Sequence, residues 1–231
     1  MVKTDEEILF LKEAATQGAL AFNAIGQLLA DNGEGKSEQR LHYEAQGVLR
    51  DFGNRDLSFD PILAINANAA KAHALPTQTV LKRGDLVLLD AGVKYRRFCS
   101  DRTRTFLFGN DISMQKDQHF SNREIQSLYD LVRKAQETAI SKARAGMQAK
   151  ELDSIARSII DTAGYGKAFS HSLGHGVGLD IHEHPYINTR NSEILEDSMV
   201  FTIEPGVYLG GKFGIRIEDT VVIKNGRAEV L

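Results

Sequence analysis

The N-terminal part of the chain contains two stretches in which apolar residues recur at helical spacing. Thr4 and Glu7 form a capping-box pattern, and apolar side chains then repeat every three or four positions up to Gly33. The members of this stripe are Ile8, Leu11, Ala15, Ala19, Phe22, Ile25 and Leu29. A second helix is predicted from an N-cap at Ser37 to a stop at Gly53, because the apolar spacing repeats there.

Two further helices are predicted in the second half of the chain. Ser121 and Glu124 form another capping-box pattern, and the helix that they open is expected to end at Gly146. Apolar residues at helical spacing in 152–160 indicate the next helix, which is expected to stop at Gly164. The second half of the chain is therefore predicted to begin with two helices, as the first half does.

Polar and apolar residues alternate in the stretches 85–108 and 199–223, so each stretch is predicted to form a β-hairpin. A short buried strand is predicted at 61–66. Two helices followed by a hairpin thus occur twice. The sequence predicts an α+β fold, a pseudo-twofold pair of helix-helix-hairpin halves around a central antiparallel sheet. A length of 231 residues suits one large domain or two small ones, and no linker divides the chain.

The first predicted hairpin carries Asp90 and Asp101. They are equidistant from the step between Tyr95 and Arg96. A turn centred on that step would make the two aspartates cross-strand neighbours, with Cβ atoms about 4.5–5.5 Å apart. Asp90 also follows the apolar run 86–89, where an unpaired charge would be costly.

The second predicted hairpin carries Glu204 and Glu218, which are equidistant from Gly211. Alternation places polar residues on one face of its strands, namely Thr202, Glu204, Tyr208, Arg216, Glu218 and Thr220. Two carboxylates so close repel each other, and one would stay protonated unless a cation lay between them. The polar face is therefore expected to line a cavity that holds divalent cations, while the opposite, apolar face packs on the helices.

Composition and charge exclude several classes of partner. The net charge of −3 gives no reason to expect nucleic acid or an anionic membrane as a partner. No apolar run approaches the roughly 18 residues of a membrane span, and the N-terminus lacks the pattern of a signal peptide. The single cysteine, Cys99, permits no internal disulfide and is interpreted as a small strand residue rather than as a nucleophile. The expected location is the cytoplasm.

The four carboxylates carry a charge of −4 when all are ionised, which two divalent cations would balance. Candidate imidazole ligands cluster in one glycine-rich segment and are His171, His175, His182 and His184. The glycines argue against a helical zinc motif there and favour a strand or a bulge. Oxygen-rich ligation with one imidazole favours Mn²⁺, with Co²⁺ and Zn²⁺ as alternatives. The residues alone are compatible with two interpretations: a two-metal hydrolase, or carboxylates that form ordinary salt bridges.

Five motifs connect this pattern with a known family. They are Leu89–Gly92, Ser100–Thr105, His171–Glu183, Ile203–Tyr208 and Gly214–Asp219. In sequence and order the motifs resemble those of the creatinase/aminopeptidase metallopeptidases, and within that family those of the Xaa-Pro aminopeptidases and dipeptidases. The resemblance covers nearly the whole chain. It implies the pita-bread fold and a peptidase that releases the N-terminal residue from peptides with proline in the second position.

The resemblance also implies a role for each matching residue. The implied ligands of two metal ions are Asp90, Asp101, His175, Glu204 and Glu218. The implied substrate-binding residues are His73, His171, His182, Tyr208 and Arg216. Three residues receive a catalytic role: Glu204 as proton shuttle, His182 as hydrogen-bond donor to the tetrahedral intermediate, and His73 as a substrate contact.

For the chain as a whole, the resemblance implies a catalytic metallopeptidase domain over residues 1–231, without the N-terminal domain that proline-specific members usually carry. A peptide is the implied substrate, and a homodimer is the assembly expected in this family. Two other functions stay open. A methionine aminopeptidase has the same five ligands on a short chain, and a non-catalytic binding module can have the same fold.

Overall fold

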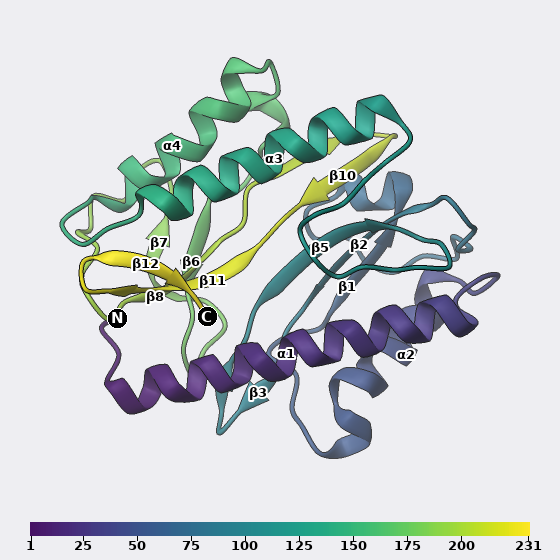
Figure 1. Ribbon diagram of the computed structural model, residues 1–231, viewed down its shortest axis with the longest axis horizontal. Coiled ribbons are helices and arrows are strands. Elements are labelled where there is room, and N and C mark those ends of the chain that lie inside the picture. Colours follow the sequence, from purple (N-terminus) through teal and green to yellow (C-terminus); the bar gives the residue numbers. More distant parts are fainter.

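Residues 1–231 are described by a computed structural model in which four α-helices cover antiparallel strands (Figure 1). The helices are α1 (Asp5–Asn32), α2 (Glu38–Leu49), α3 (Arg123–Lys142) and α4 (Ala149–Thr162), with 3₁₀ turns η1 (Asp51–Gly53), η2 (Asn66–Ala70) and η3 (Gly166–Ala168). The strands of the first half are β1 (Ile62–Ile65), β2 (Leu86–Ala91), β3 (Lys94–Tyr95), β4 (Phe98–Cys99) and β5 (Arg102–Leu107). Those of the second half are β6 (Gly174–Gly176), β7 (Glu183–Ile187), β8 (Val200–Ile203), β9 (Gly206–Leu209), β10 (Phe213–Arg216), β11 (Asp219–Lys224) and β12 (Arg227–Val230).

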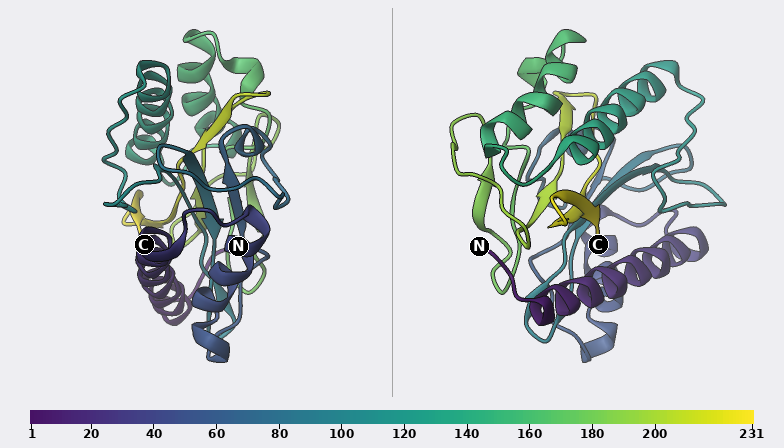
Figure 2. Two further views of the ribbon diagram at one scale, coloured as in Figure 1. Left: turned by 90° about the vertical axis from the view of Figure 1, so that its right-hand side faces the viewer. Right: turned by 60° about the vertical axis from the view of Figure 1, so that its left-hand side comes forward.

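Each half of the chain has its own core between a helix pair and strands. Helices α1 and α2 lie along one side of the molecule and α3 and α4 along the other, with the strands between them (Figures 1 and 2). The first pair encloses a core of 17 buried residues with β1, β2 and β5, and the second pair a core of 26. Burying one large apolar side chain stabilises the fold by about 1.5–3 kcal/mol, so the two cores hold the strands at fixed positions.

The predicted helices are present, with three corrections at their ends. Thr4 and Glu7 form the predicted capping box of α1, and Ser37 caps α2. The predicted N-cap of α3, Ser121, is wrong: Asn122 is the cap, because its carboxamide oxygen accepts hydrogen bonds from the first-turn amides. Helix α2 ends at Leu49 and helix α3 at Lys142, before the predicted stops at Gly53 and Gly146. No helix is both long and apolar enough to cross a membrane.

The register predicted for the first hairpin is wrong by two residues. Its turn consists of Arg96 and Arg97, both with positive φ (47° and 75°), rather than being centred on the step before Arg96. Asp90 therefore pairs with Thr103, and Asp101 lies one position before β5. The two aspartates are diagonal neighbours instead of a direct cross-strand pair. A two-residue turn of this kind normally uses glycine or asparagine, so the two arginines did not indicate it.

The central layer consists of two sheets rather than the single sheet that was predicted. One has the strand order β1-β2-β5 and the other β12-β11-β8-β6-β7, with β9 and β10 as a separate ribbon. The sheets meet where β5 lies beside β10 and β11. The amide of Glu218 donates to the carbonyl of Thr103 at 3.2 Å, and the Thr220 hydroxyl donates to the carbonyl of Asp101 at 3.1 Å. This seam brings the carboxylates of the two hairpins together.

Candidate metal centre

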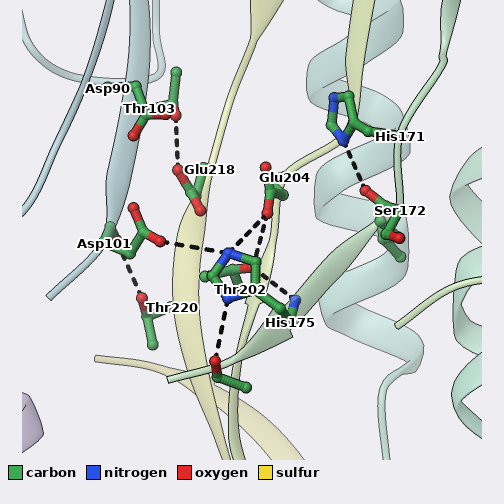
Figure 3. Close-up of polar contacts among 12 residues, drawn as sticks. Asp90, Asp101, Thr103, His171, Ser172, His175, Thr202, Glu204, Glu218 and Thr220 are labelled. Atoms are coloured by element: carbon green, nitrogen blue, oxygen red, sulfur yellow. Dashed lines mark hydrogen bonds and ion pairs between the residues drawn. The ribbon is translucent and has the colours of Figure 1, made fainter. Parts of the chain in front are cut away.

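Four carboxylates and one imidazole converge at the seam between the two sheets (Figure 3). Each comes from a strand or from its immediate end: Asp90 in β2, Asp101 before β5, His175 in β6, Glu204 after β8 and Glu218 before β11. Four of these residues are at most 9% exposed, and the Glu204 side chain is 16% exposed. The structure thus brings together all five residues for which the sequence implied metal binding.

The register of the second hairpin is the one predicted from a turn centred on Gly211, and it is shared by the ladders β9–β10 and β8–β11. Glu204 and Glu218 occupy matching positions in the gap between these ladders. Pro205, which has no amide proton to donate, lies in the same gap. The predicted apolar face packs in the larger core through Phe201, Ile203, Val207, Ile215, Ile217 and Val221.

The imidazole of His175 faces the carboxylates with one nitrogen. Its Nδ1 lies 3.1 Å from the carbonyl oxygen of Gly176, which can only accept a hydrogen bond, so Nδ1 carries the proton. Nε2 lies 3.2 Å from Glu204 Oε1 and 3.5 Å from Asp101 Oδ2. Ligand atoms of Asp101, His175 and Glu218 all lie within 4.8 Å of one another. As predicted, this segment forms a strand with a bulge rather than a helix.

Burial and mutual repulsion oppose ionisation of these carboxylates. Burial raises the pKa of Asp101 and Glu218 well above their usual range, and neighbouring carboxylates raise both further. Burial also raises the pKa of Asp90, although the guanidinium of Arg216 partly offsets this effect. Asp90 Oδ1 is buried without a hydrogen-bond partner. The donor set, rich in oxygen and short of positive charge, therefore fits divalent cations.

The predicted substrate-binding histidines line the same cavity. His73, His171 and His182 contact a space of about 380 Å³, together with Arg216 and the four carboxylates. Tyr208 does not line this cavity. Its hydroxyl instead lies 2.6 Å from Arg216 Nη1 and 2.9 Å from His171 Nε2.

The hydrogen bonds around Tyr208 define the state of His171. Nδ1 of His171 lies 2.8 Å from the carbonyl oxygen of Ser172 and must therefore carry the proton. Nε2 then accepts a hydrogen bond from the Tyr208 hydroxyl, which in turn accepts one from Arg216. Burial, reinforced by the nearby Arg216 charge, lowers the pKa of His171, which agrees with a neutral ring. Arg216 also donates to Asp90 Oδ2 at 2.6 Å, so one chain of contacts links the carboxylates to His171.

Sequence reasoning missed two threonines that hold the carboxylates in place. The Thr103 hydroxyl donates to Glu218 Oε2 at 2.7 Å. The Thr202 hydroxyl donates to Glu204 Oε1 at 3.1 Å and accepts from the amide of His175, also at 3.1 Å. Alternation had placed Thr202 on the same face as Glu204, and that signal could have identified Thr202 as a supporting residue.

Sequence reasoning also missed Glu38, which anchors the segment that carries His73. Glu38 is fully buried in the first turn of α2. Its carboxylate accepts hydrogen bonds from the amide of Ile65 (2.6 Å), the side chain of Asn68 (2.9 Å) and the amide of Thr77 (2.7 Å). These bonds close the loop between β1 and Thr77 and hold His73 at the cavity wall.

A buried ion pair lies directly behind Glu218. Asp219 accepts from Arg104 Nη2 at 2.6 Å and from Lys116 Nζ and Gln136 Nε2, both at 2.8 Å. Nη1 of Arg104 also donates to the carbonyl oxygens of Thr103 and Glu218. The pair thus joins the two sheets next to the metal centre.

Comparison with known proteins connects this geometry with a family. Residues 10–225 match the profile of metallopeptidase family M24. The chain is 39% identical over 231 residues to the Xaa-Pro dipeptidase of Pyrococcus furiosus, covering 100% of this chain and 63% of that protein. It is 40% identical to the crystal structure of a Thermococcus sibiricus prolidase, with a TM-score of 0.89, over 99% of this chain and 59% of the other.

An X-Pro aminopeptidase from Thermotoga maritima is equally similar in structure. Its TM-score is 0.89 at 38% identity, over 100% of this chain and 62% of the other. These likenesses confirm the predicted pita-bread fold. The chain spans about three fifths of the length of the relatives that it matches.

Proposed function

Because the chain belongs to metallopeptidase family M24, we propose that residues 1–231 form the catalytic domain of a metal-dependent exopeptidase. Its substrates are peptides with proline in the second position, from which it releases the N-terminal residue. The observation that carries the proposal is the buried group of Asp90, Asp101, His175, Glu204 and Glu218 at the wall of one cavity. Similarity to an Xaa-Pro dipeptidase and to an X-Pro aminopeptidase supports the choice of substrate.

We propose that these five residues bind two divalent cations, for which Mn²⁺ is the preferred ion. Four carboxylates with one imidazole suit oxygen-seeking cations, and the orphaned Asp90 Oδ1 is a free ligand atom. When bound, two such ions lower the pKa of water and polarise the scissile carbonyl. Thr103 and Thr202 orient two of the carboxylates through their hydroxyls, as supporting residues around metal sites commonly do.

Glu204 is the group that we propose moves the proton. Its carboxylate lies at the cavity wall, and the Thr202 hydroxyl holds Oε1 at 3.1 Å. Burial raises the pKa of Glu204, but the hydrogen bond with His175 and the His175 charge outweigh burial and lower the pKa to about 2. A carboxylate that is ionised at neutral pH can take a proton from the attacking water and pass it to the leaving proline nitrogen.

The cavity histidines have proposed roles in binding and orientation. Burial is the largest cause that lowers the pKa of His182, so the ring is neutral at pH 7 and can donate one hydrogen bond to the developing oxyanion. His171 presents its ring in a fixed tautomer, because Tyr208 and Ser172 occupy both of its nitrogens. His73 contacts the substrate from the opposite half of the molecule.

The decisive experiment measures release of the N-terminal residue from Ala-Pro, from Ala-Pro-Ala and from Met-Ala-Ser. The protein is stripped with a chelator and then loaded with Mn²⁺, Co²⁺ or Zn²⁺. We expect cleavage of at least one of the two Ala-Pro peptides, only in the presence of metal, and a rate at least about 10²-fold lower in Glu204→Ala, as for other acid–base residues. Glu229→Ala, at an exposed position on β12, is the matched control.

Three outcomes would contradict the proposal in different ways. Preference for Met-Ala-Ser would identify a methionine aminopeptidase instead. Cleavage of none of the three peptides despite bound metal would favour a non-catalytic binding module. Cleavage that resists the chelator would exclude the metal-dependent reaction. The cytoplasmic location and the homodimer also stay proposals; ultracentrifugation of the purified chain tests the dimer.

A further inference from the structure

The N-terminal segment of the chain is tied to the strand that leads to the metal centre. The amide of Lys3 donates to the carbonyl oxygen of Ser198 at 2.9 Å, and Val2 forms an antiparallel bridge with Met199. Ser198 and Met199 precede β8, which ends next to Glu204, and the N-terminus lies beside β8 (Figure 1). The side chain of Lys3 is 4% exposed, whereas a lysine is almost never buried without a partner. The segment therefore brings a buried positive charge next to the second sheet.

The partner of this charge is Glu183, which is 180 residues away in the sequence. The ammonium group of Lys3 forms an ion pair with Glu183 Oε1 and also donates to the carbonyl oxygen of Met1 at 3.3 Å. The Glu183 side chain is 12% exposed, and no other group of the protein donates to its carboxylate. Removing one partner of a buried ion pair leaves the other charge uncompensated, which is strongly destabilising. Lys3 and Glu183 therefore hold each other in place.

Glu183 closes a loop that begins and ends in the ladder of β6 and β7. Gly176 in β6 pairs with Glu183 in β7, so residues 177–182 form the loop between them. A Cβ atom at Gly178 would lie 2.2 Å from Glu183 Oε2, so the carboxylate lies against the backbone of the loop. The carbonyl oxygen of Gly178 in turn accepts a hydrogen bond from the amide of Cys99 at 2.8 Å. The ion pair thus lies at the base of the loop, where its two ends meet.

The last residue of this loop is His182, the proposed hydrogen-bond donor to the oxyanion. Its ring forms no hydrogen bond with the protein, and the centroid of the ring lies 4.2 Å from that of the His175 ring. On one side of His182, the side chain of Ile181 packs against a small buried cluster between α1 and the second sheet. On the other side is Glu183, paired with Lys3. Because the imidazole has no hydrogen bond of its own, its position beside His175 depends on these two neighbours.

We infer that Lys3 and Glu183 are positioning residues for His182, because their ion pair fixes the end of the loop from which the imidazole reaches the developing oxyanion. The inference rests on the proposed function and adds two residues on which its rate depends. Neither residue lines the cavity, so neither touches the substrate. An interaction made only in the transition state affects kcat and leaves KM unchanged. A displacement of about 1 Å at a distance from the chemistry can lower a rate about 10²-fold.

Kinetics of the Mn²⁺-loaded protein on Ala-Pro and Ala-Pro-Ala test the inference. We expect Lys3→Met to lower kcat about 10-fold to 10²-fold at unchanged KM, and Lys3→Arg, which keeps the charge, to restore most of the lost rate. In the His182→Ala background, Lys3→Met should cause no further loss, because the two residues act through one interaction. The double variant Lys3→Met/Glu183→Gln leaves no unpaired buried charge, so it should fold even where Lys3→Met does not, with the same loss of kcat. Lys12→Met, at an exposed position of α1, is the matched control and should retain full activity.

A second measurement follows the loop without metal or substrate. In the chelator-treated protein, Lys3→Met should increase hydrogen–deuterium exchange in residues 176–183 and leave exchange in β1, β2 and β5 unchanged, because only the loop loses its anchor.

The results that overturn the inference are distinct from those that overturn the function. Unchanged kcat in Lys3→Met, an equal loss in the His182→Ala background, or exchange that rises throughout the chain would contradict the positioning role. Cleavage of neither Ala-Pro peptide by the unmodified protein would overturn the proposed function, and with it the role in the reaction, whereas the exchange measurement would still show whether Lys3 anchors the loop.

Discussion

Replacement of Asp219 by asparagine tests whether the ion pair behind the metal centre joins the two sheets. The side chain is 8% exposed and accepts hydrogen bonds from Arg104, Lys116 and Gln136. Asparagine has nearly the same shape but no charge. The substitution therefore leaves the guanidinium of Arg104, which is 3% exposed, without its counter-charge.

The expected loss in the free energy of unfolding follows from the electrostatics around Asp219. Burial raises the pKa of Asp219, but the charges of Arg104 and Lys116 outweigh burial and lower it from 3.8 to about 2. At about 1.4 kcal/mol for each pKa unit, the folded protein stabilises the carboxylate by about 2 kcal/mol. Removing one partner of a buried pair typically costs about 3–5 kcal/mol. We expect Asp219→Asn to lower the free energy of unfolding by about 3 kcal/mol.

Urea unfolding at pH 7 in the presence of a chelator measures this loss. With an m-value of about 3 kcal/mol/M, the midpoint should fall by about 1 M at unchanged m. Asp117→Asn is the matched control, since Asp117 is 77% exposed and pairs with Arg133 only at the surface. Its loss should stay below about 0.5 kcal/mol.

The pH dependence provides an independent check. A carboxylate whose pKa is lower in the folded chain contributes its full stabilisation above its unfolded pKa, and this contribution is lost as pH falls through the folded pKa. The difference between the unmodified protein and Asp219→Asn should therefore be constant above pH 5 and shrink between pH 4 and pH 2. A loss below 0.5 kcal/mol at pH 7, or a difference that does not change down to pH 2, would refute the reasoning.

Three further predictions concern the metal centre and the cavity. Thr103→Val removes the hydroxyl that donates to Glu218 and should weaken Mn²⁺ binding about tenfold in calorimetry, whereas Thr138→Val at a half-buried position of α3 should not. Mn²⁺ at 100 times its Kd should raise Tm by about 5–10 °C in scanning calorimetry, and a similar rise in Glu218→Gln would contradict the ligand assignment. Arg157→Met removes the donor to the His171 carbonyl and should raise KM for Ala-Pro-Ala while leaving Mn²⁺ affinity unchanged; a parallel loss of metal affinity would instead indicate general disruption of the fold.

The sequence by itself determined the features that depend on neighbours along the chain. The capping box at Thr4 and the apolar period after it predicted α1, because a helix buries one stripe at a spacing of 3.6 residues. Alternation predicted which faces of β8 to β11 are apolar, since successive side chains in a strand point to opposite sides. Gly211 marked the turn that sets the register of the second hairpin, because it adopts a positive φ of 76°.

Only the tertiary structure decided the features that depend on contacts between distant segments. The first hairpin turns at Arg96 and Arg97, and no residue type there indicated a positive φ, so its register followed from packing rather than from a local signal. The support of Glu218 by Thr103 arises because two sheets with separate cores meet at one seam.

Local spacing determines which face of a helix or strand is buried. Which buried faces meet depends on the closure of long loops around shared cores. The free energy that stabilises such a closure comes from contacts between residues far apart in the chain.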